Sequence, residues 1–240
     1  MKKNLVLFPL LVSVLYSCGQ STPSTPEQLT TDNTSLDSLE ATRDSLRSQK
    51  YDPQTYIYSD STYTDVSGRN IRIQNSFPKG GGYLDLSSSS IGFSPFNNIS
   101  YGHAVFWTRV INESDAPLEL SINFPADSLA IFPATPEAHL KLFIPPATMT
   151  LDKVAQYSYG ITGLESYLTA NFYKPSILQR TIAPKEEWIF YVALLSHIPE
   201  VSPGPRRTGL ILDGKTLYYQ ISTTLPETYL MPCGELVFKE

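Results

Sequence analysis

An alternation of apolar and polar residues between 118 and 124 is the most regular pattern in the chain. Its apolar positions are Leu118, Leu120, Ile122 and Phe124. Successive side chains of a strand point to opposite faces, so this period of two predicts a strand with one face on a core and the other in water. The turn-forming residues of 112–117 mark where that strand begins.

Two longer apolar runs, at 101–111 and 188–195, are apolar at both parities. Runs of this length and composition predict strands that are buried on both faces or nearly so. Shorter stretches with strand character lie at 70–74, 83–86 and 139–144. The sequence therefore predicts several short strands rather than a few long helices.

A hairpin is predicted where Asp213-Gly214 separates residues 209–212 from 216–222, since this dipeptide favours tight turns between strands. Many short strands with turn-rich joins, and no alternation of strands with helices, predict an all-β sandwich for residues 56–240. The pattern resembles the immunoglobulin-like β-sandwich in a loose sense. The paired cysteines of antibody domains are absent, so the strand topology stays open.

Residues 147–183 lack the strand pattern and predict a short helical insertion. Leu151 and Val154 have helical spacing, and Thr162 with Glu165 matches a capping box ahead of further apolar residues. Excursions from a rigid scaffold can vary without loss of the core, so function is sought here first. The candidate ligand-binding residues are Tyr157, Tyr159, Tyr167 and Tyr173. The alternative is that these rings, with Phe172, only cap one end of the core.

The first residues have the order of a secretory signal peptide, residues 1–17, with Lys2 and Lys3 ahead of an apolar run that is too short to span a bilayer. The tetrapeptide Leu15-Tyr16-Ser17-Cys18 resembles the lipobox of bacterial lipoprotein precursors. The resemblance implies cleavage before Cys18, acylation of its thiol, and attachment to a membrane through the acyl chains. Gly19, in place of Asp, leaves the route to the bacterial outer membrane open, with the domain facing the periplasm or the surface.

Residues 18–55 are rich in Ser, Thr, Asp and Gln and predict a flexible tether with a marginal helix at 34–49. Several Asp-Ser triplets resemble the sequon that some Gram-negative bacteria O-glycosylate on exported proteins. The candidate modified residues are Ser38, Ser45, Ser61 and Ser128.

Composition narrows the class of function. The 240-residue chain is 41% hydrophobic with a formal charge of −5, and removal of residues 1–17 takes away Lys2 and Lys3 to give −7. This acidity argues against nucleic acid as a partner, because binding to phosphates needs clustered basic residues. With Cys18 acylated, Cys233 has no partner for an internal disulfide, and its Pro232 and Gly234 neighbours predict a loop.

The sequence contains few candidate catalytic or cofactor motifs, and no cofactor or metal is predicted. His103, His139 and His197 share no metal-ligand spacing. Ser76 and Lys79 match a serine-acylase motif in letters, but Pro78 and the following glycines cannot continue the helix that the motif requires. Trp107 and Trp188 could form a glycan platform, although their strands favour burial in the core.

Two functions from different classes are consistent with these observations. The favoured one is a membrane-anchored lipoprotein of the cell envelope that acts as a binding or structural module for a protein or glycan. The alternative is a small secreted hydrolase with carboxylate chemistry on the sandwich loops, because paired carboxylates need to meet only in space.

Overall fold

The computed structural model describes residues 52–80, 83–84, 101–130, 138–197, 207–222 and 228–239. The chain divides into two units, Met1–Gln49 and Lys50–Glu240, and every described residue belongs to the second. The signal peptide predicted at 1–17 and most of the tether lie outside the described residues. So do Cys18, Ser38 and Ser45. The described part begins with a 3-10 turn, η1 (Pro53–Tyr56), which Asp52 caps.

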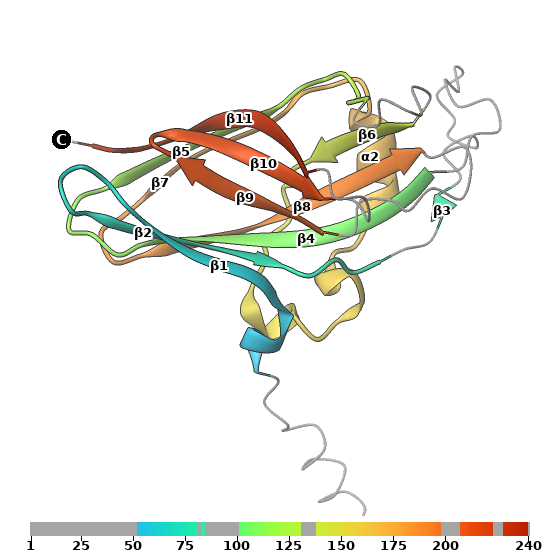
Figure 1. Ribbon diagram of the computed structural model, residues 1–240. Helices are drawn as coiled ribbons and strands as arrows, with labels where there is room; N and C mark the ends of the chain where they lie inside the picture. Colours follow the sequence, from blue (N-terminus) through green and yellow to red (C-terminus); the bar gives the residue numbers. More distant parts are fainter. Residues whose placement is uncertain are drawn as a thin grey trace, which may run out of the picture. The chain divides into compact units, whose positions relative to one another are not determined.

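Two antiparallel sheets face each other in this unit (Figure 1). Sheet A has the strand order β1-β2-β4-β8-β6, with β3 paired to β4, and sheet B has the order β7-β5-β11-β10-β9. The strands of sheet A are β1 (Ile57–Thr64), β2 (Asn70–Ser76), β3 (Tyr83–Leu84), β4 (Tyr101–Asn112), β6 (His139–Phe143) and β8 (Glu187–His197). The strands of sheet B are β5 (Leu118–Phe124), β7 (Ser176–Ile182), β9 (Arg207–Asp213), β10 (Thr216–Ser222) and β11 (Thr228–Phe238). The predicted all-β sandwich is confirmed, while the likeness to immunoglobulin domains stays a prediction.

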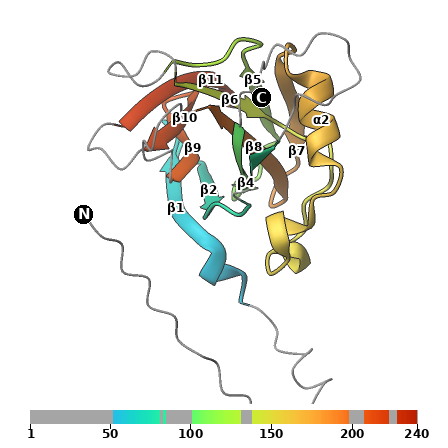
Figure 2. The same ribbon diagram turned by 90° about the vertical axis from the view of Figure 1, so that its right-hand side faces the viewer.

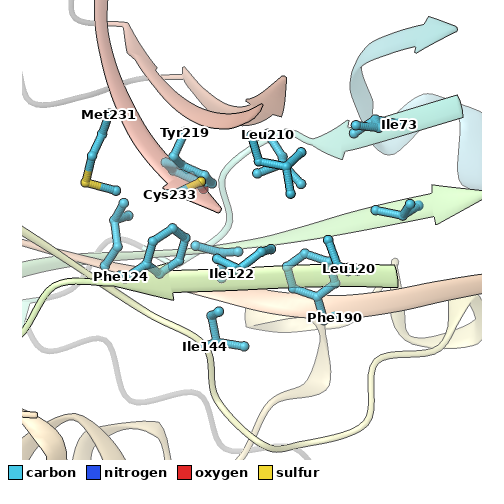
Figure 3. Packing of buried hydrophobic residues seen from close by; sticks show 14 of the residues in the cluster. Ile73, Leu120, Ile122, Phe124, Ile144, Phe190, Leu210, Tyr219, Met231 and Cys233 are labelled. Carbon is cyan, nitrogen blue, oxygen red and sulfur yellow. The ribbon is translucent and has the colours of Figure 1, made fainter. Parts of the chain in front are cut away.

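The main core lies between the inner faces of the two sheets (Figure 3). The four apolar residues of β5 are all buried, as their period of two predicts, and Glu119 and Asn123 between them are exposed. Phe124 packs edge-on against Tyr219 of β10, with ring centroids 5.3 Å apart. Each buried side chain of this kind contributes about 1.5–3 kcal/mol through removal from water.

A second apolar layer covers the outer face of sheet A. It is formed by residues 145–175, here called the outer layer, which hold η3 (Leu151–Lys153), η4 (Tyr157–Gly160) and α2 (Leu164–Asn171). Leu168 packs on Phe143 and Leu195, while Met149 and Tyr159 pack on Trp107 and Tyr191. Figure 2 shows α2 lying beside the sheet. This layer explains why β4 and β8 are apolar at both parities.

The prediction of a helical insertion at 147–183 is correct for the part of it that lies in the outer layer, up to residue 175. Residues 176–182 form strand β7, so the expectation that they continue the insertion is wrong. β7 is an edge strand of sheet B. Its burial does not alternate regularly, because Ile177 is 60% exposed and a charged residue, Arg180, pairs with buried Leu120. The sequence therefore shows no period of two here.

Two local predictions also need correction. Thr162 does not cap α2, because Gly163, in the left-handed region at φ +67°, is the N-cap and brings the chain into the helix. Cys233 does not lie in a loop but in β11, where the register with β10 shifts between Leu217 and Tyr218. The predicted hairpin between β9 and β10 is confirmed, with Gly214 at φ +60° in its turn.

None of the helices in the described part of the chain is long and apolar enough to cross a membrane.

Candidate functional site

The outer edge of β6 in sheet A is covered by residues 125–129. Leu129 and Leu140 exchange two backbone hydrogen bonds, of 2.6 and 2.9 Å. The buried ammonium group of Lys141 donates to the carbonyl oxygens of Pro125 and Ala126. Burial lowers the pKa of this lysine, and Asp127 nearby raises it by a smaller amount. These contacts cover the β6 edge at Leu140 and Lys141.

The outer edge of β9 in sheet B is closed by a side chain. The amide of Asn75, from β2, donates to the carbonyl oxygen of Leu210 (3.0 Å) and accepts from its N–H (2.9 Å). Ser59 and Thr108 complete the hydrogen bonding of this buried amide. Asn75 thus takes the place of a neighbouring strand at Leu210, in the middle of β9.

The edge of β1 has no covering strand among the described residues, but it is irregular and charged. Its register with β2 shifts between Ile57 and Ser59. Asp60 binds the guanidinium group of Arg72 through two hydrogen bonds and also accepts from Gln74. The Arg72 contact lowers the pKa of the Asp60 carboxyl group. Bulges and charges are common means of protecting an edge strand.

The edge of β7 is regular and open. β7 pairs with β5 in an unbroken register from Ser176 to Ile182. Within the described part of the chain, the backbone groups of residues 177–181 make no hydrogen bond to any strand other than β5. The side of β7 that faces away from β5 is called the β7 edge below. It is the most regular uncovered edge among the described strands.

A shallow groove of about 360 Å³ adjoins the β7 edge. It is lined by Glu119, Leu120 and Ser121 of β5 and by Gln179, Arg180 and Thr181 of β7, and is called the β5–β7 groove. Glu119 forms an ion pair with Lys239. The guanidinium carbon of Arg180 lies 4.0 Å from the centroid of the Trp188 ring, and Arg180 forms no ion pair with a described carboxylate. The open backbone edge of β7 therefore has polar side chains, Gln179 and Thr181, on its outer face and the positive charge of Arg180 on its core-facing side.

The tyrosines predicted as ligand-binding residues do not converge on one site. Tyr159 is fully buried, its hydroxyl group donates to the carbonyl oxygen of Phe77 (2.5 Å), and burial raises its pKa. Tyr167 is half-buried and donates to the carbonyl oxygen of Ile144 (2.9 Å). Tyr157 and Tyr173 are exposed. Tyr159 and Tyr167 attach the outer layer to sheet A, which matches the alternative role considered for them.

The fold brings together residues that the sequence separates. His139 and His197 lie opposite each other on neighbouring strands, with ring centroids 6.5 Å apart. The ring centroid of Tyr101 is 5.5 Å from that of His197. Burial raises the pKa of Tyr101 to about 12. No sequence spacing could reveal this group, because each residue belongs to a different strand. The described residues hold no set of three or more histidine, cysteine or acidic side chains arranged to bind a metal ion.

The nucleophile candidates have other contacts or are buried. Ser76 accepts from the N–H of Trp107, while Lys79 donates to the carbonyl oxygens of Val154 and Gln156. Cys233 is buried, and burial raises its pKa to about 12, so it stays a thiol at neutral pH.

Ser158 is the described serine whose surroundings come nearest to those of a nucleophile. Its backbone has φ +46°, and its hydroxyl group has no hydrogen-bond partner among the described residues. Ser158 and His103 both flank Gly80, since a Cβ atom there would lie 3.3 Å from Ser158 Oγ and 3.2 Å from His103 Nε2. Only 4% of Ser158 is exposed, and its hydroxyl group does not bond to His103, so this geometry does not support catalysis.

The remaining predicted residues are divided between core and surface. Trp107 is fully buried and Trp188 is partly buried beneath Arg180. Ser61 lies on β1 and Ser128 precedes the Leu129 bridge, and both are exposed. Exposure is compatible with modification of either serine.

A scan against protein-family models gives no match. A search of curated proteins likewise finds no relative.

Proposed function

We propose that the protein is a membrane-anchored lipoprotein of the cell envelope whose β-sandwich binds a partner protein at the β7 edge. The lipobox-like Leu15-Tyr16-Ser17-Cys18 supports the anchor. Two or three acyl chains on one cysteine hold a protein stably at a membrane, at about 0.8 kcal/mol per buried methylene group. The folded unit then needs no membrane-binding surface of its own and can bind another molecule.

The observation that supports the binding site is the open edge of β7. The edges of β6 and β9 are covered at Leu140 and Leu210 and that of β1 is bulged, whereas β7 is straight in register and borders the β5–β7 groove. Uncovered edge strands are common sites of protein recognition, because their backbone groups are ready to bond.

A protein ligand is favoured over a glycan by the placement of the aromatic rings. Glycans stack on flat, exposed aromatic faces, and Trp107 is fully buried while Trp188 is covered by Arg180. Among the described residues, the exposed aromatic side chains lie on four separate segments: Phe77 after β2, Tyr157 in η4, Tyr173 after α2 and Tyr229 in β11.

The proposal is tested by photo-crosslinking in the native envelope. A photo-crosslinking amino acid replaces Gln179 on β7 or, as a matched control, Thr62 on β1, in the full-length lipidated chain. We expect a discrete protein adduct from position 179 and none from position 62. Equal adducts from both positions, or an adduct to polysaccharide only, would contradict a protein-binding site at β7.

A further inference from the structure

We infer that the β7 edge takes up an extended segment of the partner protein as an added strand, with an acidic side chain opposite Arg180. This inference rests on the proposed function and adds the chemistry of the partner. It follows from the backbone of β7, from the contact between Arg180 and Trp188, and from the distribution of charge around the strand.

The backbone of β7 has hydrogen-bonding groups that an added strand can use. In an antiparallel ladder the N–H and C=O of one residue point to the same side, so every second residue of β7 directs both groups away from β5. These groups have no strand partner among the described residues. A segment of similar length to the seven residues of β7 can continue the ladder of sheet B.

Arg180 determines which side chain the added strand should carry. Arg180 pairs with Leu120, whose side chain faces the core, and its guanidinium group lies over Trp188 of the opposite sheet. Stacking uses the flat face of a guanidinium group and leaves its N–H edge available for two parallel bonds to a carboxylate. The partner residue directly across from Arg180 would have its Cβ atom about 4.5–5.5 Å from that of Arg180, within reach of Asp or Glu.

The charge around the strand agrees with an acidic partner. The chain has a formal charge of −5, yet Lys174 before β7 and Arg180 within it form no ion pair with a described carboxylate. Lys185, after β7, pairs with Asp115, and Glu119 in the groove pairs with Lys239. Glu186, in the turn after β7, forms no ion pair with a described basic residue either, so the unpaired charges in and beside β7 are two positive and one negative.

The same charge argues against a second copy as the occupant. Two copies joined through β7 would bring two Arg180 side chains to one seam, and β7 carries no carboxylate to compensate them. Like charges across a strand pair are destabilising. A partner segment with Asp or Glu removes this repulsion and gains a charge-assisted hydrogen bond.

The experiment uses two labelled peptides and the full-length lipidated chain in detergent. Both peptides have about seven alternating Val and Thr residues, with Glu at the centre of one and Lys at the centre of the other. Binding is measured by fluorescence anisotropy, and the bound edge is located by amide hydrogen exchange. Arg180→Glu is the test variant. Arg207→Glu is the matched control, since Arg207 also lies over aromatic rings, those of Tyr58 and Phe77, but on closed strand β9.

We expect the Glu peptide to bind at least about tenfold more tightly than the Lys peptide, and Arg180→Glu to reverse that order. Arg207→Glu should leave it unchanged, and exchange should slow at every second amide of β7. Equal binding of the two peptides, an unchanged order in Arg180→Glu, or protection on β1 would overturn the inference. So would concentration-dependent dimers that Arg180→Glu abolishes. If the adduct from Gln179 persists while neither peptide binds, the proposed function stands and strand addition fails.

Discussion

Gly209 of β9 lies so close to Asn75 of β2 that a methyl group on the glycine would be 2.7 Å from Asn75 Cγ. The close approach lets the Asn75 amide reach both backbone groups of Leu210. One buried side chain therefore joins the two sheets and closes the edge of β9. The absence of a side chain at position 209 is a condition of this contact.

Gly209→Ala should therefore displace the Asn75 amide and lower the free energy of unfolding by about 2–4 kcal/mol, since it adds a clash to lost buried hydrogen bonds. Urea denaturation measures the effect. In an Asn75→Ala background the same substitution should cost much less, because the clashing group is gone. Equal costs in the two backgrounds would show that the two residues do not interact as described.

The tyrosines of the outer layer should differ in effect on stability. Tyr159→Phe removes the hydrogen bond to the carbonyl oxygen of Phe77 and should lower the free energy of unfolding by about 1 kcal/mol. Tyr157→Phe, at a side chain that is 76% exposed, is the matched control and should change it by less than about 0.5 kcal/mol. Denaturant unfolding of both variants checks this. A larger loss in Tyr157→Phe than in Tyr159→Phe would contradict the assignment of Tyr159 to packing.

Cys233 should make the fold sensitive to alkali. Burial raises the pKa of its thiol from 9.0 to about 12 in the folded chain, so above pH 9 the folded state holds a proton that the unfolded state releases. The stabilising contribution is complete below pH 9 and is lost progressively toward pH 12. Cys233→Ala should unfold more easily at pH 7, because it leaves a small cavity, but should lose less stability between pH 8 and pH 10. Parallel pH profiles for the two proteins would contradict the burial of a neutral thiol.

The sequence predicts strands that bury one face in a single core, because their apolar residues alternate with polar ones, and it predicts turns with a strong local signal. The alternation in 118–124 and the Asp213-Gly214 turn both appear as expected. The apolar runs of β4 and β8 indicate burial on both faces but not what provides it, because the outer layer packs through contacts distant in sequence.

The candidate site is harder to foresee. β7 is an edge strand with exposed Ile177. Its Arg180 lies at a core-facing position, where the guanidinium group packs on the ring of Trp188 from sheet A. Neither feature gives a periodic signal. Which edge is left open can be seen only in the assembled sheets, where Asn75 bonds to β9 and Leu129 bonds to β6.

The anchor at Cys18 is tested most directly by the intact mass of the protein purified from its own membranes. We expect an amino terminus at Cys18 with added diacylglyceryl or triacyl mass and no residue from 1–17. A free amino terminus at any other residue, with no fatty acid attached, would contradict the lipid-anchored role and with it the location in the envelope.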